Sequence, residues 1–155
     1  MAIDTVTSEA TREGLPIFAQ QAVFESYVPQ APGYWAVLLF GLIQMLRWEA
    51  IGSLIIRVKQ WTMKEGLVFV TVFSREDPSY DFYSREGRPL GRNSFITAAG
   101  DIRTFLEPDE ILDLFRDFSA LHHWEGMGPV HRHGHGPEER HARIEAVFQK
   151  TIPAG

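Results

Sequence analysis

The alternation of apolar and polar positions divides most of the chain into strands and helices of an α/β protein. Continuous apolar runs over 34–40 and 67–73 are typical of parallel strands that are covered on both faces of a sheet. Between them, apolar residues recur at helical spacing from Arg47 to Met63, and Gly66 follows as a stop signal. The first run therefore predicts a central strand, and the segment after it predicts an amphipathic helix.

The C-terminal half predicts one more helix and two strands. Proline and acidic residues stand at the start of 107–116, where the first turn of a helix and its dipole favour them. Strands are expected over 118–124 and 142–149, joined by a connection rich in glycine and histidine. These two strands are predicted to form a terminal hairpin.

The N-terminal region predicts a strand, a short helix and a second strand, over 2–4, 8–14 and 15–19. No internal repeat or linker interrupts the pattern. Residues 1–155 are therefore predicted to form a single domain of alternating strands and helices.

Composition narrows the classes of function. The apolar content of 45% is enough for a core, and the net charge of -5 disfavours nucleic acid or an anionic membrane surface as partner. The absence of cysteine excludes disulfides, thiolate zinc sites and thiol nucleophiles. The first residues lack a secretion signal, and no apolar run reaches the roughly 20 residues of a membrane-spanning helix. A cytoplasmic protein that binds small molecules or other proteins is expected.

Several segments resemble, in their order and spacing, the later two-thirds of class I S-adenosylmethionine (SAM)-dependent methyltransferases. The run YWAVLLFGLIQML at 34–46 resembles the fourth strand of the family and the turn after it, and MKEGLVFVTVFS at 63–74 resembles the approach to the fifth strand. Segments 75–80, 105–111 and 141–150 are similar to methyltransferases of the tellurite-resistance kind. The resemblance implies an incomplete Rossmann-like fold, truncated at its N-terminus, with a mostly parallel sheet and a C-terminal antiparallel hairpin.

The resemblance also implies SAM as cofactor. The tripeptide AID resembles the end of the second strand of the family, where Asp4 would accept hydrogen bonds from the ribose hydroxyls. Phe40 and Gly41, at the end of the fourth strand, are the other expected cofactor contacts. The glycine-rich turn that normally precedes them is missing, and Val23 and Trp35 stand where the family has acidic residues.

The missing first strand affects the expected function as well as the sheet. In the family this strand lies between the second and the fourth, so without it the N-terminal strands have no neighbour to pair with. Three explanations of the missing strand remain open: a lost upstream start, a strand supplied by a partner chain or second copy, and a rearranged N-terminal packing.

The expected function is a SAM-dependent methyltransferase that acts on a small molecule and is incomplete or partner-dependent. The alternative is a non-catalytic subunit that binds a protein partner or self-associates.

The polar, turn-rich segment 74–100 follows the fifth strand, where methyltransferases commonly shape the acceptor pocket. Its aromatic residues Tyr80 and Tyr83 are candidates for that pocket, and an exposed aromatic loop is the equally open alternative. His123, from the adjacent histidines at 122 and 123, is a further candidate, although such a pair commonly places one ring in the core and one in solvent.

A histidine-rich stretch is the strongest chemical cluster in the sequence. Alternating histidines in an extended segment point to one side, and neutral imidazoles with a carboxylate suit a divalent metal. The candidate ligands are His131, His133, His135, Glu138 and His141. The simpler interpretation, a solvated and glycine-rich hairpin loop without a metal, is favoured over it. A histidine-based metal-binding protein is therefore the weakest of the three functional alternatives.

Overall fold

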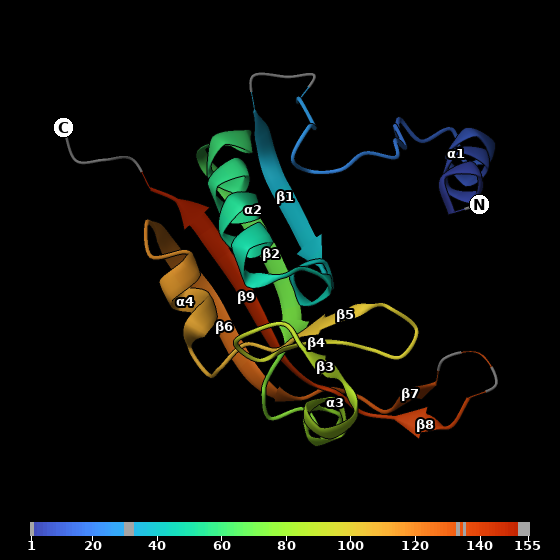
Figure 1. The fold of residues 1–155 in the computed structure, drawn as a ribbon. Coiled ribbons are helices and arrows are strands. Elements are labelled where there is room, and N and C mark those ends of the chain that lie inside the picture. The colour runs from blue at the N-terminus through green and yellow to red at the C-terminus, as the bar shows by residue number, and fades with distance from the viewer. Residues whose placement is uncertain (1, 30–32, 133, 135, 152–155) are drawn as a thin grey trace.

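A four-stranded sheet lies at the centre of the molecule (Figure 1). The computed structural model describes residues 2–29, 33–132, 134 and 136–151. The strands follow the order β1 (Tyr34–Phe40), β2 (Thr62–Phe73), β9 (Ala142–Lys150) and β6 (Phe118–Met127). β1 and β2 are parallel, whereas β9 is antiparallel to both of its neighbours. The expected C-terminal antiparallel hairpin is present, and among the described strands of this sheet parallel pairing is confined to β1 and β2.

The remaining elements are helices and two smaller sheets. The helices are α1 (Ala2–Arg12), α2 (Trp48–Trp61), α3 (Tyr80–Glu86) and α4 (Glu110–Leu114), with a short 3-10 helix, η1, over Ile43–Met45. A small sheet contains β3 (Arg88–Pro89), β4 (Ser94–Ile96) and β5 (Ile102–Thr104), and a two-stranded hairpin contains β7 (His131–Arg132) and β8 (Glu138–Glu139). Among the described residues, no helix combines the length and apolarity needed to cross a membrane.

The core lies between one face of the sheet and helices α2 and α4. The predicted helix over 47–63 is confirmed as α2, whose buried positions follow helical spacing at Ile51, Leu54, Ile55 and Val58. Every second residue of β2 and β9 faces this layer: Val68, Val70, Val72, Ile144, Ala146 and Phe148 are buried. The ring of Phe115, just after α4, stacks on Phe148 with centroids 4.6 Å apart. Burial is thus concentrated on one face of the sheet.

The prediction of a central strand covered on both faces is wrong for β1. The strand forms at the predicted residues, but it has β2 as its only strand neighbour among the described residues. Trp35, Leu38 and Phe40 are 66%, 57% and 60% exposed, whereas Leu39 is buried. A continuous apolar run shows that a strand can be buried on both faces, but other segments of the fold must supply the cover.

Two N-terminal strand predictions are also wrong. Residues 2–4 belong to helix α1, which also contains most of the short helix expected at 8–14 and lies apart from the sheet (Figure 1). Residues 15–19 form no strand; instead, the Ile17 amide donates to the Leu15 carbonyl at 2.8 Å. A strand requires a ladder partner, and no described segment pairs with this one.

The helix expected at 107–116 forms over the shorter range of α4. It begins after Asp109, which adopts a left-handed conformation with φ 62°.

Lys150 joins the last strand to the end of α2. Its ammonium donates to the carbonyls of Lys59 at 2.6 Å and Thr62 at 2.8 Å, where the helix dipole favours a cation. We expect Lys150→Met to lower the free energy of unfolding by about 1 kcal/mol, the usual size of a charge-assisted cap. Urea denaturation would measure this change. Lys64→Met is the matched control, because Lys64 is exposed, and an equal loss in both variants would contradict the capping role.

Candidate functional site

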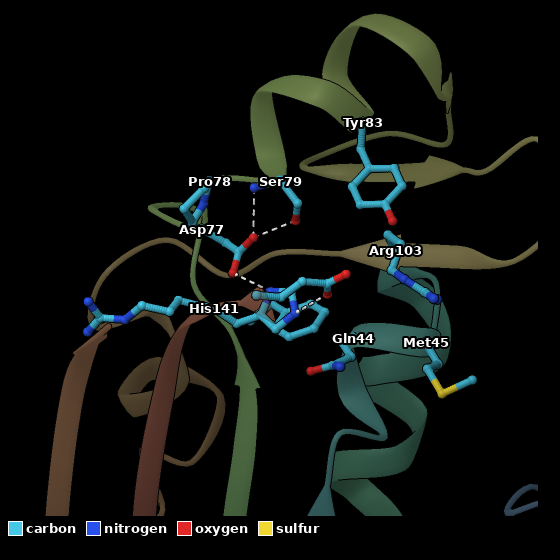
Figure 2. A pocket seen from close by; sticks show the side chains of 11 residues that line it. Gln44, Met45, Asp77, Pro78, Ser79, Tyr83, Arg103 and His141 are labelled. Atoms are coloured by element: carbon cyan, nitrogen blue, oxygen red, sulfur yellow. Dashed lines mark hydrogen bonds and ion pairs between the residues drawn. The ribbon is translucent and has the colours of Figure 1, made fainter. Parts of the chain in front are cut away.

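A cavity of about 740 Å³ opens where the parallel strands β1 and β2 end. The turn after β1, the segment after β2, strand β5 and the loop before β9 form its walls. Its lining includes the labelled residues of Figure 2: Gln44, Met45, Asp77, Pro78, Ser79, Tyr83, Arg103 and His141. Ligands of open α/β sheets bind outside the carboxyl ends of the strands. This cavity is therefore the candidate functional site.

Gly41 directs the chain from β1 into the cavity wall. It adopts φ 65°, a conformation that glycine reaches without strain. Its amide lies 3.1 Å from the Thr71 carbonyl and 3.2 Å from the Thr71 hydroxyl, so the turn is fixed to β2. The 3-10 helix η1 follows and places Gln44 and Met45 at the cavity (Figure 2).

Asp77 and His141 form the buried polar centre of the site. The Asp77 side chain is fully buried and accepts hydrogen bonds from the Ser79 amide at 2.8 Å and from the Ser79 hydroxyl. Its other oxygen accepts from Nδ1 of His141 at 3.0 Å (Figure 2). The His141 ring also packs on Phe73, with centroids 4.8 Å apart. Asp77 therefore orients this imidazole and fixes its Nδ1 proton, because a carboxylate can only accept.

Charges of both signs border the cavity. Arg103 and Arg140 supply guanidinium groups, and Asp77 and Glu139 supply carboxylates. Nε2 of His141 lies 3.5 Å from Oε2 of Glu139. Such a lining suits a small polar molecule better than an apolar one, because several donors and acceptors converge on the same space.

A smaller cavity of about 230 Å³ adjoins the first. Gln44, Phe73 and His141 line both cavities, and Gly41 and His131 line the smaller one. The two spaces therefore meet at the His141 ring. This arrangement places the predicted cofactor residue Gly41 next to the polar centre of the site.

The structure separates the residues predicted for the acceptor pocket. Tyr83 lines the larger cavity. Tyr80 instead packs edge-on against Phe95 and Phe105, and its hydroxyl donates to Asn93 at 2.9 Å. His123 lies on β6, where its Nδ1 is 3.7 Å from Asp109.

The predicted cofactor residues are also separated. Phe40 and Gly41 are adjacent at the end of β1, as the resemblance implied, but Asp4 lies on helix α1 away from the sheet (Figure 1). The expected position of Asp4 at the end of a strand is wrong. Its proposed contact with ribose remains a prediction that no observation tests.

The predicted metal ligands are partly brought together. Within the described residues, His131, Glu139 and His141 gather their ligand atoms within 4.8 Å of one another. Glu138 instead pairs with Arg132 at 3.1 Å. His133 and His135 lie outside the described residues.

The sequence interpretation missed Asp77, Gln44 and Arg103, and it took Glu138 rather than the adjacent Glu139 as the carboxylate ligand. Only Asp77 carried a signal, because Asp-Pro-Ser directly after a buried strand is typical of a side-chain turn at a functional edge.

An apolar groove of about 720 Å³ runs beside β1, the strand at one edge of the sheet. Residues of the N-terminal segment, β1 and α2 line it, among them Phe18, Phe24, Leu38 and Trp61. The hydroxyls of Tyr27 and Tyr34 are 2.6 Å apart and attach the N-terminal segment to β1. This hydrogen bond, together with partial desolvation, raises the pKa of the Tyr27 phenol above its ordinary value.

The fold is that of the class I SAM-dependent methyltransferases. TehB from Haemophilus influenzae superposes with a TM-score of 0.69 at 17% identity over 96% of this chain and 46% of its own. A SAM-dependent methyltransferase from Methanosarcina mazei superposes with a TM-score of 0.71 at 12% identity, over 97% of this chain and 78% of its own. A third structure is the 1,6-didemethyltoxoflavin-N1-methyltransferase of Burkholderia thailandensis, with bound 1,6-didemethyltoxoflavin and S-adenosylhomocysteine. It superposes with a TM-score of 0.66 at 17% identity, over 95% of this chain and 56% of its own.

No family model and no curated protein sequence matches the chain. The chain spans about half the length of the Haemophilus and Burkholderia proteins. At such low sequence identities, the likeness establishes the fold.

Proposed function

We propose that the chain is a SAM-dependent methyltransferase-like protein that acts on a small molecule. The observation that carries this proposal is the polar cavity at the carboxyl ends of β1 and β2 in a class I methyltransferase fold. The Burkholderia relative in fold, whose structure contains a small acceptor and S-adenosylhomocysteine, supports the same arrangement. In this proposal the acceptor occupies the larger cavity and SAM lies beside the end of β1.

Phe40 and Gly41 fit a position beside SAM. Phe40 is 60% exposed and offers an aromatic face, while a Cβ built on Gly41 would meet only the Gln44 side chain, 3.7 Å away. Close approach of a ligand to a backbone commonly requires such a glycine. SAM would supply an electrophilic methyl group to a nucleophilic atom of the acceptor.

The polar lining of the cavity would bind and orient the acceptor. The Nε2 lone pair of neutral His141 can accept a hydrogen bond from an acceptor N–H or O–H, because Asp77 holds the ring proton on Nδ1. Arg103 and Gln44 offer donors on the facing wall. Orientation alone can remove a large part of a transfer barrier, so the proposed activity requires no covalent protein intermediate.

The open edge of β1 supports a partner-dependent form of this activity. The strand YWAVLLF carries no charge to protect its edge, and the apolar groove runs beside it. A strand from another segment or chain would pair with β1 and enclose the cofactor side of the site. The same observation favours the second candidate, a non-catalytic subunit that uses this edge to bind a protein or another copy.

Calorimetric titration of the purified chain with SAM, with light scattering to record its oligomeric state, tests the proposal. Saturable binding is expected, and Gly41→Val should weaken it about tenfold or more, because a β-branched residue costs roughly 1–2 kcal/mol in the left-handed region. Gly52→Val, at an exposed helix position, is the control for folding. If the folded chain binds no SAM, the self-sufficient enzyme is excluded and the subunit is favoured.

A further inference from the structure

A compact group of nitrogen and oxygen ligands lies between the two cavities. The register of the β7–β8 hairpin pairs His131 with Glu139, so these residues stand directly opposite each other. His141 follows just before β9, and its ring lies 5.2 Å from the ring of His131. The ligand atoms of all three residues lie within 4.8 Å of one another, and all three side chains are half-buried.

Hydrogen bonds to carbonyl and carboxylate oxygens determine which nitrogen atoms can bind a cation. Nδ1 of His141 donates to Asp77 at 3.0 Å, which leaves Nε2 as the basic nitrogen of the neutral ring. Nδ1 of His131 lies 3.3 Å from the Pro129 carbonyl, which can only accept, so Nε2 is again the basic nitrogen. In both rings the Nε2 lone pair is therefore the one suited to a metal.

Nε2 of His141 faces a carboxylate rather than a donor. Its separation from Oε2 of Glu139 is 3.5 Å, and in the neutral ring both atoms are acceptors. Two such acceptors are stable side by side when a cation lies between them, either a proton on the imidazole or a metal ion. Donor atoms bound at about 2.0–2.2 Å to one tetrahedral ion lie about 3.3–3.6 Å apart, so this pair already has a suitable separation.

Asp77 supplies the support that a metal-binding histidine requires. Metal-bound imidazoles usually donate their second ring N–H to a carboxylate or carbonyl, which fixes the ring and raises its basicity. Asp77 is fully buried and is itself held by two hydrogen bonds from Ser79. This support is independent of the ligand cluster, because it comes from the turn after β2.

We propose that His131, Glu139 and His141 bind a divalent first-row transition metal of the zinc type. Two imidazoles and one carboxylate suit zinc and its neighbours, whereas magnesium and calcium favour all-oxygen sites. The ligand atoms lie within 4.8 Å of one another and would close to about 3.5 Å around one ion, so the side chains would move by about 1 Å or less. The larger cavity, which Glu139 and His141 line, leaves room for water or a small-molecule heteroatom as a further ligand.

A bound metal would take the Nε2 lone pair of His141 that the proposed function assigns to an acceptor N–H or O–H, so the two proposals share this residue. The test of the metal site involves neither SAM nor methyl transfer. The chain, with any affinity tag removed and metal stripped by chelation, is titrated with zinc by calorimetry. The visible spectrum of the cobalt-substituted protein reports the coordination. One ion per chain is expected. H131A and H141A should each weaken zinc binding by about 100-fold, because losing even a group that only hydrogen-bonds to a metal ligand lowers metal affinity by about 10–100-fold.

Two further variants separate a metal site from surface binding. D77N, which keeps the shape of the side chain but weakens its hold on His141, should lower zinc affinity by about 10–100-fold. H122A removes an exposed imidazole on β6 and should leave affinity unchanged. Circular dichroism melting checks that each variant is folded. Absence of saturable binding, or binding that survives H131A and H141A, overturns the proposal.

Discussion

Phe148→Ala is expected to lower the free energy of unfolding by about 3–5 kcal/mol, the usual loss for a buried phenylalanine. Phe148 is 1% exposed and lies on β9, the strand between β2 and β6. Its ring stacks on Phe115, which in turn meets Phe118 edge-on with centroids 5.7 Å apart. The substitution would therefore open a cavity at the point where the sheet, the end of α4 and the start of β6 meet.

Chemical denaturation with urea, followed by circular dichroism, would measure this loss. Phe82→Ala is the control, because Phe82 is 55% exposed on α3 and should change the free energy of unfolding by less than about 0.5 kcal/mol. Similar losses in the two variants would show that Phe148 is not part of a tightly packed core.

Asp77→Ala is expected to lower the free energy of unfolding by about 2–4 kcal/mol, because each buried donor left without a partner costs about 1–3 kcal/mol. The donors that lose their partner are the Ser79 amide, the Ser79 hydroxyl and the His141 ring. Asp77 connects the segment after β2 with the start of β9, so these two segments should be destabilised most. Hydrogen exchange of the Ser79 amide would report this destabilisation locally.

Glu76→Ala provides the matched control for Asp77. Glu76 is the adjacent carboxylate, but it is exposed, so its removal should change stability by no more than about 0.5 kcal/mol. The loss of stability in Asp77→Asn should lie between the losses in Asp77→Ala and Glu76→Ala, because the amide oxygen can still accept hydrogen bonds from Ser79. An Asp77→Ala variant as stable as Glu76→Ala would refute the structural role of this carboxylate.

The elements of the fold that could be predicted from the sequence are those with a strong local pattern. α2 follows its 3.6-residue periodicity, and β1, β2, β6 and β9 form close to the predicted residues. The position of a strand within the sheet has no such local pattern, because it depends on segments distant in the sequence. For the same reason the apolar run of β1 predicted a strand correctly and its burial incorrectly.

The site was less accessible to sequence reasoning because its members come together from distant segments. Asp77 and His141 are separated by 64 residues, and no local pattern connects them. Glu138 was the candidate carboxylate ligand in the sequence, but the register of the β7–β8 hairpin places the adjacent Glu139 opposite His131. The register of a hairpin depends on its turn, and a one-residue change moves every side chain to the other face.

The strand order has a consequence for how the chain is made. β9 contains residues 142–150, yet it lies between β2 and β6, so the interior of the sheet is synthesised last. Ribosomes add about 5–20 residues per second, so β2 would wait several seconds without its partner on that side. During this interval the nascent chain exposes the unpaired edges of β2 and β6 to other chains and to chaperones. Completion of this sheet should therefore wait until β9 has left the ribosome.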